Sequence, residues 1–414
     1  MTTPTAPNSI SFNQIVNEFG GLKTNSNQSG YDIGAYRVEQ TVNGIKYRLD
    51  VDDLGLSPVP KSGQISFNDL RGRSLNVIVD INGGTKVNAR NDKWNNNNTI
   101  VIGGGPKKEE GSRIIIHVRG TVQSERGTHP IGVDDGQGGT SGNRWRCALK
   151  TGSWEEIVSL DVIVGPGNNN GHIRGGGGNG GKGGTSDGEK SESEQDKANG
   201  FPGCHGTSAL GLNHNIRNLV VNSGSTIYAG GGGGGGGAGA GGELDGDSSD
   251  ERAGGGGGGG GMGTPAGLGG EAGSNNSGGE RIPEDGENGN ATSGGDGGRS
   301  GSNNESGGED SADGGGGGGG GGINKGEGGA AETGEGGETG NDGDEMDNNL
   351  PTGDPGRGRG GDGGDGDAEG TGQQTGEGGE GGGFGGAVLK GGYNISSTTG
   401  NNRIYGNTRD TTPL

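Results

Sequence analysis

The sequence predicts a mostly irregular, all-β chain in which a sandwich of polyglycine II helices is bracketed by β hairpins. Three observations lead to this fold class. Uninterrupted glycines fill residues 230–237, 254–261 and 314–322. Short β-branched runs, separated by Asn, Gly and Asp, fill the chain from residue 75 to residue 165. A phrase of strand character recurs beside the glycine runs.

Composition divides the chain. Only 22% of the residues are hydrophobic and 3% aromatic, too little for ordinary cores throughout 414 residues. Most of the 114 glycines and most of the acidic residues behind the net charge of -21 follow residue 170. We therefore expect an N-terminal module over residues 1–75, a β domain over 76–170, a glycine-rich polyglycine II domain with variable loops over 171–390, and a closing β strand and tail over 391–414.

The N-terminal module contains the phrase ISFN twice, at residues 10–13 and 65–68. Ser11 and Gln14 fit a capping box, so a short helix is expected there, and Ser66 with Asp69 predicts a similar turn. Between them, residues 36–51 alternate as a hairpin with Asn43-Gly44 at the bend. This region is therefore expected to be an ordered module.

The β domain is expected to contain strands within residues 75–81, 99–104, 112–122 and 157–165. Three tryptophans lie in it, Trp94, Trp145 and Trp154, and are interpreted as core or half-core residues. Related strand units begin at Cys147, Ser208 and Ala387, and each ends in an x-Ile-x triplet. We expect these units to be hairpins or rungs that stack and close the glycine segment at both ends.

Glycine runs need a physical reason to be ordered. A single left-handed threefold helix has no internal hydrogen bonds. Ordering eight residues costs roughly 8–16 kcal/mol, and each hydrogen bond between helices returns about 0.5–1.5 kcal/mol. Only an array of many helices is therefore expected to be stable. The alternative is a flexible linker, although linkers seldom consist of glycine alone. Collagen is excluded because the strict G-X-Y period is missing.

The polyglycine blocks separated by polar loops, the strand-turn-IYxGGGG phrase and SGQISFNDLRGRS at residues 62–74 together resemble one family. It comprises the glycine-rich adhesins at the tips of long tail fibres in T-even-like bacteriophages. The resemblance covers roughly residues 60 to 410. It implies a sandwich of polyglycine II helices whose far loops bind receptors on the bacterial surface.

Candidate chemistry is weak elsewhere. GGGNGGKG at 176–183 lacks the hydroxyl residue of a phosphate-binding loop. GGDGGDGDA at 360–368 resembles a Ca²⁺ repeat, but Asp367 occupies its hydrophobic position. Cys204, His205 and His214 lack metal-site spacing, and Cys147 and Cys204 are interpreted as free thiols more often than as a disulfide. We predict no enzyme, no cofactor and no metal.

The expected partners are a bacterial surface receptor, protein or polysaccharide, and another tail-fibre or baseplate protein held by the N-terminal module. The protein is expected in the virion, at the fibre tip, after synthesis in the host cytoplasm. Nucleic acid is not expected because the chain is acidic. No secretion signal and no apolar run long enough for membrane insertion is found in the sequence.

Four long, dissimilar loops favour an adhesin: residues 185–203, 243–253, 271–293 and 341–359. The alternative is a structural fibre or baseplate component in which the glycine domain is a rigid spacer, and a glycine-rich matrix or cell-wall protein is weaker still. The receptor-binding candidates in these loops are charged residues and one aromatic residue: Asp187, Phe201, Asp245, Asp247, Arg281, Asp285, Asp342, Asp344, Asp347, Arg357 and Arg359.

Overall fold

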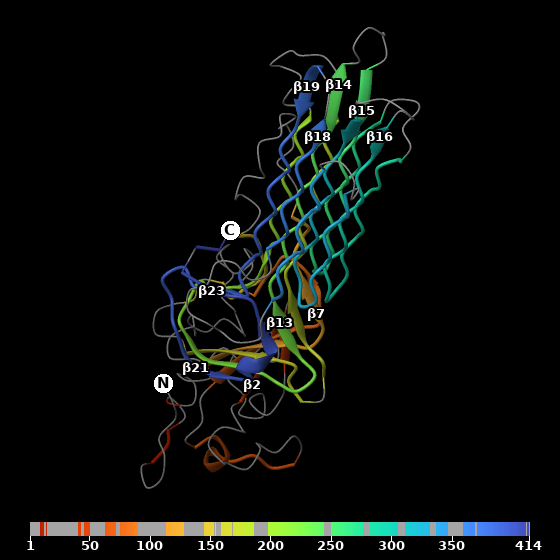
Figure 1. The fold of residues 1–414 in the computed structure, drawn as a ribbon. Coiled ribbons are helices and arrows are strands. Elements are labelled where there is room, and N and C mark those ends of the chain that lie inside the picture. The colour runs from red at the N-terminus through yellow and green to blue at the C-terminus, as the bar shows by residue number, and fades with distance from the viewer. Residues whose placement is uncertain are drawn as a thin grey trace.

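The fold is known from a computed structural model. It describes residues 9–11, 14, 40–42, 45–49, 63–71, 75–89, 113–127, 145–152, 154, 159–167, 169–185, 198–243, 250–275, 281–304, 311–331, 337–346, 359–368, 371–410 and 412–413. Figure 1 shows a base of β strands and a long bundle of extended segments that leaves it. No helix among the described residues has the length and apolar character to cross a membrane.

The base is built from three sheets, and the chain visits them in turn. The first sheet contains β1 (Gln40–Val42), β2 (Ile45–Leu49), β3 (Leu75–Ile81), β6 (Arg113–Val118), β9 (Ser159–Val164), β12 (Ile216–Val221) and β21 (Ile395–Thr399). The second contains β4 (Gly84–Thr85), β7 (Thr121–Gln123), β10 (His172–Arg174), β13 (Thr226–Tyr228) and β22 (Ile404–Tyr405). The third contains β5 (Val87–Asn88), β8 (Cys147–Lys150), β11 (Ser208–Gly211), β20 (Val388–Leu389) and β23 (Thr408–Arg409).

From β3 onward all neighbouring strands in these sheets are parallel. Each turn of the chain adds one strand to each sheet, so the base is a stack of rungs of the β-solenoid type, called the solenoid below. The repeated strand units are therefore rungs, which is one of the two expected arrangements. The predicted bracketing hairpins are wrong, because β8, β11 and β20 pair side by side in parallel.

The solenoid core follows from alternation along the strands. Ile114, Ile116 and Val118 of β6 pair in register with Leu160, Val162 and Val164 of β9. All six side chains are buried and join one apolar cluster that also includes residues of the other two sheets. Like residues therefore stack from rung to rung between the three sheets. The predicted strands within 75–81, 112–122 and 157–165 are confirmed, and the one at 99–104 lies outside the described residues.

The N-terminal predictions are confirmed where residues are described. The Ser11 backbone N–H donates to Oε1 of Gln14 at 2.7 Å, as a capping box requires. Ser66 and Asp69 form a capping box at the start of the 3₁₀ helix η2 (Phe67–Leu70). Strands β1 and β2 pair as an antiparallel hairpin and extend the first sheet beyond β3. A second 3₁₀ helix, η4 (Asn401–Arg403), precedes β22.

Three long insertions leave the solenoid at one corner, between a strand of the second sheet and the next strand of the third. They span residues 124–146, 175–207 and 229–387. In the first rung the same corner is the single residue Lys86, and in the last it is Gly406 and Asn407. The glycine bundle is therefore an outgrowth of one solenoid corner.

Twelve extended segments form the bundle within the described residues. Three are inner segments, residues 230–239, 254–262 and 314–322. Nine are outer segments: residues 175–184, 198–207, 267–273, 284–290, 294–301, 326–330, 338–344, 359–366 and 376–385. Each inner segment forms backbone hydrogen bonds with six neighbours. Residues 230–237, 254–261 and 314–321 belong to no strand.

Hydrogen-bond partners in the inner segments repeat every three residues. Gly231, Gly234 and Gly237 donate to Met262, Gly259 and Gly256 at 2.8–2.9 Å. The next set along the same segment, Gly230, Gly233 and Gly236, donates instead to segment 198–207. A residue three positions further on thus meets the same neighbour. Because all three faces of an inner segment meet backbone, no face has room for a side chain.

The bundle has an apolar seal at the base and small sheets at its outer end. Tyr228, Met262, Met346 and Phe384 form a buried cluster where the bundle joins the solenoid. At the outer end β14 (Ala240–Glu243) pairs with β15 (Asp250–Ala253) and β19 (Thr371–Thr375), and β17 (Ser311–Asp313) pairs with β16 (Ser302–Asn304) and β18 (Asp367–Ala368). Figure 1 shows these strands at the end of the bundle opposite the solenoid.

Candidate functional site

The segments run alternately away from the solenoid and back, so their connections gather at two ends. At the outer end, called the distal end below, the chain turns between residues 185 and 198, 243 and 250, 275 and 281, 304 and 311, 331 and 337, and 368 and 371. At the solenoid end, called the proximal end, it turns at 263–266, 290–293 and 323–325, and between residues 346 and 359. The distal end therefore gathers six connections and the proximal end four.

The described members of the predicted receptor-binding set are not brought together. Arg281 and Asp285 lie on the chain returning from the distal end. Asp344 and Arg359 lie at the proximal end, where the Asp344 backbone N–H donates to the Arg359 carbonyl at 2.8 Å. The remaining loop aspartates and Arg357 lie outside the described residues: Asp187, Asp245, Asp247, Asp347 and Arg357. The described residues of the predicted loop 341–359 thus lie at the proximal end, whereas the predicted loop 271–293 spans the bundle from the distal turn at 275–281 to the proximal turn at 290–293.

Phe201 belongs to the bundle itself. Its backbone N–H donates to Lys182, and its carbonyl accepts from Gly236, both at 2.8 Å. Its side chain is half-buried on the outside of segment 198–207. Phe201 therefore lies in a glycine segment and not in a free loop.

Several of the acidic residues complete the hydrogen bonding of the bundle edge. Oδ1 of Asp285 accepts from the backbone N–H of Ala272 at 2.7 Å, and Oδ1 of Asp342 accepts from Gly328 at 3.0 Å. One turn after Asp285, Asn288 accepts from Gly269 in the same way at 2.9 Å. An outer segment has no neighbour on its solvent side, and these side chains satisfy the exposed donors there. The same role falls to Asn179, Asn199, Asp296, Asp362 and Asp365.

The proximal charged residues pair with each other. Nζ of Lys325 lies 2.9 Å from Oδ2 of Asp342, and this hydrogen bond, with the one from Gly328, lowers the pKa of the Asp342 carboxyl. Nη2 of Arg359 lies 2.9 Å from Oδ1 of Asp362, and its Nε donates to the Gly381 carbonyl at 3.3 Å. These groups already have partners within the bundle, so their first role is in the edge of the scaffold.

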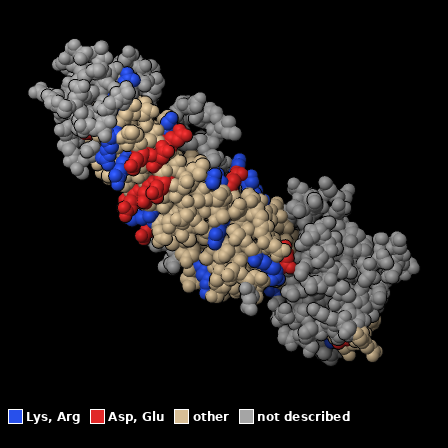
Figure 2. All heavy atoms as spheres, turned by 90° about the vertical axis from the view of Figure 1, so that its right-hand side faces the viewer, with Lys and Arg blue, Asp and Glu red and all other residues tan. Residues whose placement is uncertain are grey.

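Charge on the bundle side is mixed. Figure 2 shows acidic side chains gathered in a band across one face, with Lys and Arg side chains beside them. Arg299 and Glu284 lie 3.8 Å apart and Lys182 and Glu271 lie 4.0 Å apart, and all four side chains are exposed. Exposed pairs of this kind stabilise a fold by less than about 1 kcal/mol. The band is therefore mainly a solvated surface.

Ile282 was missed in the sequence, because a single apolar residue in a polar loop gives little signal. Its side chain is 80% exposed, the highest value among the large hydrophobic residues described. It lies beside Arg281 on the chain that returns from the distal end. A single exposed apolar side chain is common on protein surfaces.

The cysteines and histidines form no metal site within the described residues. Cys147 and Cys204 are both buried and form no disulfide, which confirms the interpretation as thiols. Burial raises the pKa of the Cys147 thiol to about 12, so it stays protonated and unreactive at neutral pH. Nδ1 of His205 accepts from the Gly383 backbone N–H at 2.7 Å. In the described part of the chain no group of three or more His, Cys, Asp or Glu could hold a metal ion.

Replacing Asp285 separates its scaffold role from a charge role. Asp285→Ala should lower the free energy of unfolding by about 1 kcal/mol, because the Ala272 N–H loses its acceptor. Asp285→Asn should retain stability, since Asn288 performs the same role one turn later. Chemical denaturation of both variants checks this. Equal stability of the Ala variant and the original protein would contradict the edge role.

Comparisons with known proteins give one remote likeness. No protein-family model matches the chain, and no curated protein matches it. One solved structure, the crystal structure of the gp37-gp38 adhesin tip complex of the bacteriophage S16 long tail fiber, aligns with 58% of this chain and 71% of that chain. The identity is 18% and the TM-score 0.22, so the likeness carries no argument about function.

Proposed function

We propose that this protein is an adhesin at the tip of a bacteriophage tail fibre, and that its distal turns bind a receptor on the bacterial surface. The observation that carries the proposal is the alternation of the glycine segments, which gathers six chain connections at one end of a closely packed scaffold. The sequence resemblance to glycine-rich tail-fibre adhesins supports the same role. The proposed activity is binding, without catalysis and without a cofactor.

We infer that the glycine segments are threefold helices of the polyglycine II type. A helix with three residues per turn returns to the same neighbour every third residue, and the hydrogen-bond partners of the inner segments repeat with that period. Six neighbours around each inner segment agree with hexagonal packing of such helices. A rigid scaffold of this kind fixes the ends of the distal turns while their sequences remain free to vary.

The proposal extends to the other end of the molecule. Residues 1–75 would attach the protein to another tail-fibre or baseplate protein, and the site of action would be the virion. The receptor would be a surface protein or polysaccharide, recognised by polar groups and by Ile282 and Arg281 near the distal end. Deleting residues 1–60 would then abolish incorporation into the particle.

Replacing turns at one end at a time tests the binding role. The distal variant has residues 186–197, 244–249, 276–282 and 305–310 replaced with Gly-Ser chains of equal length, and the control has residues 347–358 at the proximal end replaced. We expect the distal variant to adsorb to host cells at least about tenfold more weakly, equivalent to about 1.4 kcal/mol. The proximal control should adsorb as the original protein does.

Adsorption is measured with purified labelled protein on a panel of bacterial strains. Equal adsorption of the distal variant and the original protein would overturn the assignment to the distal turns. It would favour the structural alternative, in which the bundle is a rigid spacer of the fibre or baseplate. Loss of adsorption in the proximal control alone would move the site to the solenoid end.

A further inference from the structure

A small pocket lies on the solenoid, far from the distal turns. It has a volume of about 260 Å³ and is lined by Lys86, Val87, Asn88, Arg146, Cys147 and Lys150. The first three residues belong to the corner and third-sheet strand of the first rung, and the others to β8 and the residue before it. β5 and β8 pair directly, with Asn88 opposite Lys150. Two adjacent rungs therefore form the pocket.

The pocket is cationic in an acidic protein. Three of its six lining residues carry a positive charge, whereas the whole chain has a net charge of -21. The acidic side chain beside it is Glu125, whose Oε2 lies 2.5 Å from Nζ of Lys86 and whose Oε1 pairs with Arg146. Lys150 has no acidic partner among the described residues. One carboxylate thus balances only part of the positive charge.

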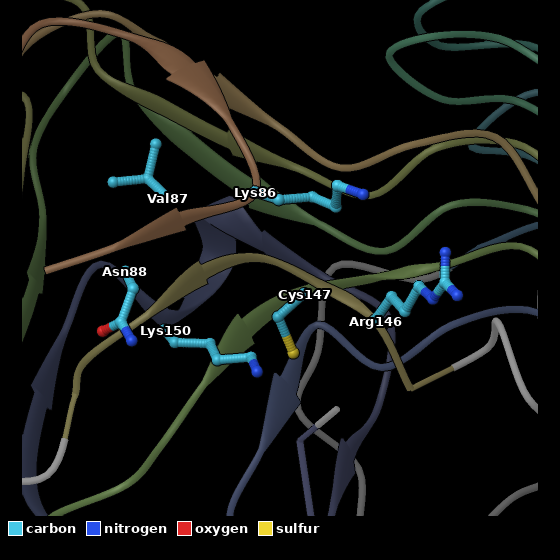
Figure 3. A pocket seen from close by; sticks show the side chains of 6 residues that line it. All are labelled: Lys86, Val87, Asn88, Arg146, Cys147 and Lys150. Atoms are coloured by element: carbon cyan, nitrogen blue, oxygen red, sulfur yellow. The ribbon is translucent and has the colours of Figure 1, made fainter. Parts of the chain in front are cut away.

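Figure 3 shows how these side chains lie. Lys86 and Arg146 extend in the same direction from two levels of the pocket, and Lys150 directs its ammonium toward Cys147. The buried thiol of Cys147 and the Val87 strand residue give the pocket an uncharged wall. Charged ammonium and guanidinium donors form strong hydrogen bonds to anionic oxygens. An uncharged wall beside them weakens the screening by water and strengthens this attraction. The pocket is therefore suited to an anionic oxygen group.

The backbone at Lys86 is held in an unusual conformation. Its φ is +50°, the only positive φ of a non-glycine residue in the described part of the chain. A lysine is strained in this conformation, whereas glycine adopts it without strain. The corresponding corners of three later rungs hold insertions, and that of the last rung holds Gly406 and Asn407. Among the described rungs, Lys86 is therefore the corner residue that brings a cationic side chain to the pocket.

We propose that this pocket binds a phosphate or carboxylate group of a small anionic ligand, held by Lys86, Arg146 and Lys150. Arg146 and Lys86 would divide their hydrogen bonds between the Glu125 carboxylate and the ligand. Lys150 would supply a positive charge that has no acidic partner among the described residues. This site is separate from the distal turns and does not rest on the proposed receptor role.

Calorimetry with four probes tests the site and identifies the group. The probes are inorganic phosphate, glucose 6-phosphate, acetate and glucuronate, added to the full-length protein at low salt. We expect one probe pair to bind, the phosphates or the carboxylates, and Lys150→Ala to weaken that binding at least tenfold. Lys182→Ala is the control, because this lysine lies on the bundle with its side chain 53% exposed.

A second variant keeps the test independent of folding defects. Lys86→Gly removes one cation from the pocket but relieves the backbone at φ +50°. It should therefore be at least as stable to denaturation as the original protein and still bind the anion several-fold more weakly. Binding of none of the four probes would overturn the proposal. Equal binding by the original protein and the Lys150→Ala and Lys86→Gly variants would also overturn it.

Discussion

Replacing Gly257 with alanine is expected to lower the free energy of unfolding by about 3 kcal/mol, the upper part of the range for an overpacked core. Gly257 is in the inner segment 254–262, and a Cβ there would lie well under 3.0 Å from the carbonyl oxygen of Gly270. That oxygen belongs to backbone, which cannot rotate away as a side chain can. The added methyl would also reduce the conformational entropy of the unfolded chain, but this stabilises the folded protein by only about 0.4–1 kcal/mol.

The matched control is Glu271→Ala, one residue after the carbonyl that Gly257 approaches. Glu271 lies on an outer segment with its side chain 82% exposed, so this change should alter stability by less than about 0.5 kcal/mol. Calorimetry of both variants measures the difference. Gly257→Val should have a larger effect than Gly257→Ala. An alanine variant as stable as the control would mean that the inner segments are not closely packed.

Replacing Asp161 should destabilise the solenoid by about 3 kcal/mol, because it removes the buried carboxylate that two arginines bind. Asp161 of β9 faces away from the solenoid core and its side chain is only 1% exposed. Its carboxylate accepts from Nε of Arg113 at 2.6 Å and from Nη2 of Arg217 at 2.6 Å, and Asn218 adds a third donor at 2.9 Å. Asp161→Asn keeps one acceptor and should cost less than Asp161→Ala.

The same group predicts sensitivity to acid. Burial alone would raise the pKa of Asp161, but the hydrogen bonds and charges of Arg217 and Arg113 outweigh it and lower the pKa in the folded protein. Its stabilising contribution is therefore complete above the unfolded pKa of about 3.9 and is lost as the pH falls below that value toward the folded pKa.

Denaturation followed by tryptophan fluorescence measures both effects, since Trp145 and Trp154 flank β8 in the solenoid. Asp161→Asn should flatten the fall in stability below about pH 4. The exposed pair of Glu284 and Arg299 supplies the control, and Glu284→Gln should change stability by less than about 0.5 kcal/mol. An unchanged acid profile in Asp161→Asn would contradict the assigned role.

The positions of the inner segments could be predicted because a segment surrounded on all sides requires an uninterrupted run of glycine. A segment surrounded on every side needs glycine at all positions, and only residues 230–237, 254–261 and 314–322 have such runs. Outer segments leave one face to solvent, so in residues 359–366 aspartate takes every third place. Segment 284–290 and residues 341–344 were predicted as parts of loops for this reason. Glycines three residues apart, such as Gly286 and Gly289, were the signal available.

Neighbours in space could not be predicted in the same way. Leu210 pairs with Val388, and the intervening chain forms most of the bundle. Strand character depends on local residue type, but pairing between rungs depends on where each insertion begins and ends. β5 has only two residues, Val87 and Asn88, and so gives no periodicity at all. Which end of the bundle each candidate loop occupies depends on how distant segments pair. The amino-acid composition of the loops does not indicate it.

The three-residue repeat of hydrogen-bond partners has a consequence for how related sequences can differ in length. Adding or removing three residues within a glycine segment shifts it by one full turn, so every later residue keeps its direction. A change of one or two residues would turn charged positions such as Asp362 and Asp365 toward neighbouring backbone. Inside the segments, relatives should therefore differ in length by multiples of three residues, and two segments joined by a turn should change together. The distal turns should vary in length without this restriction.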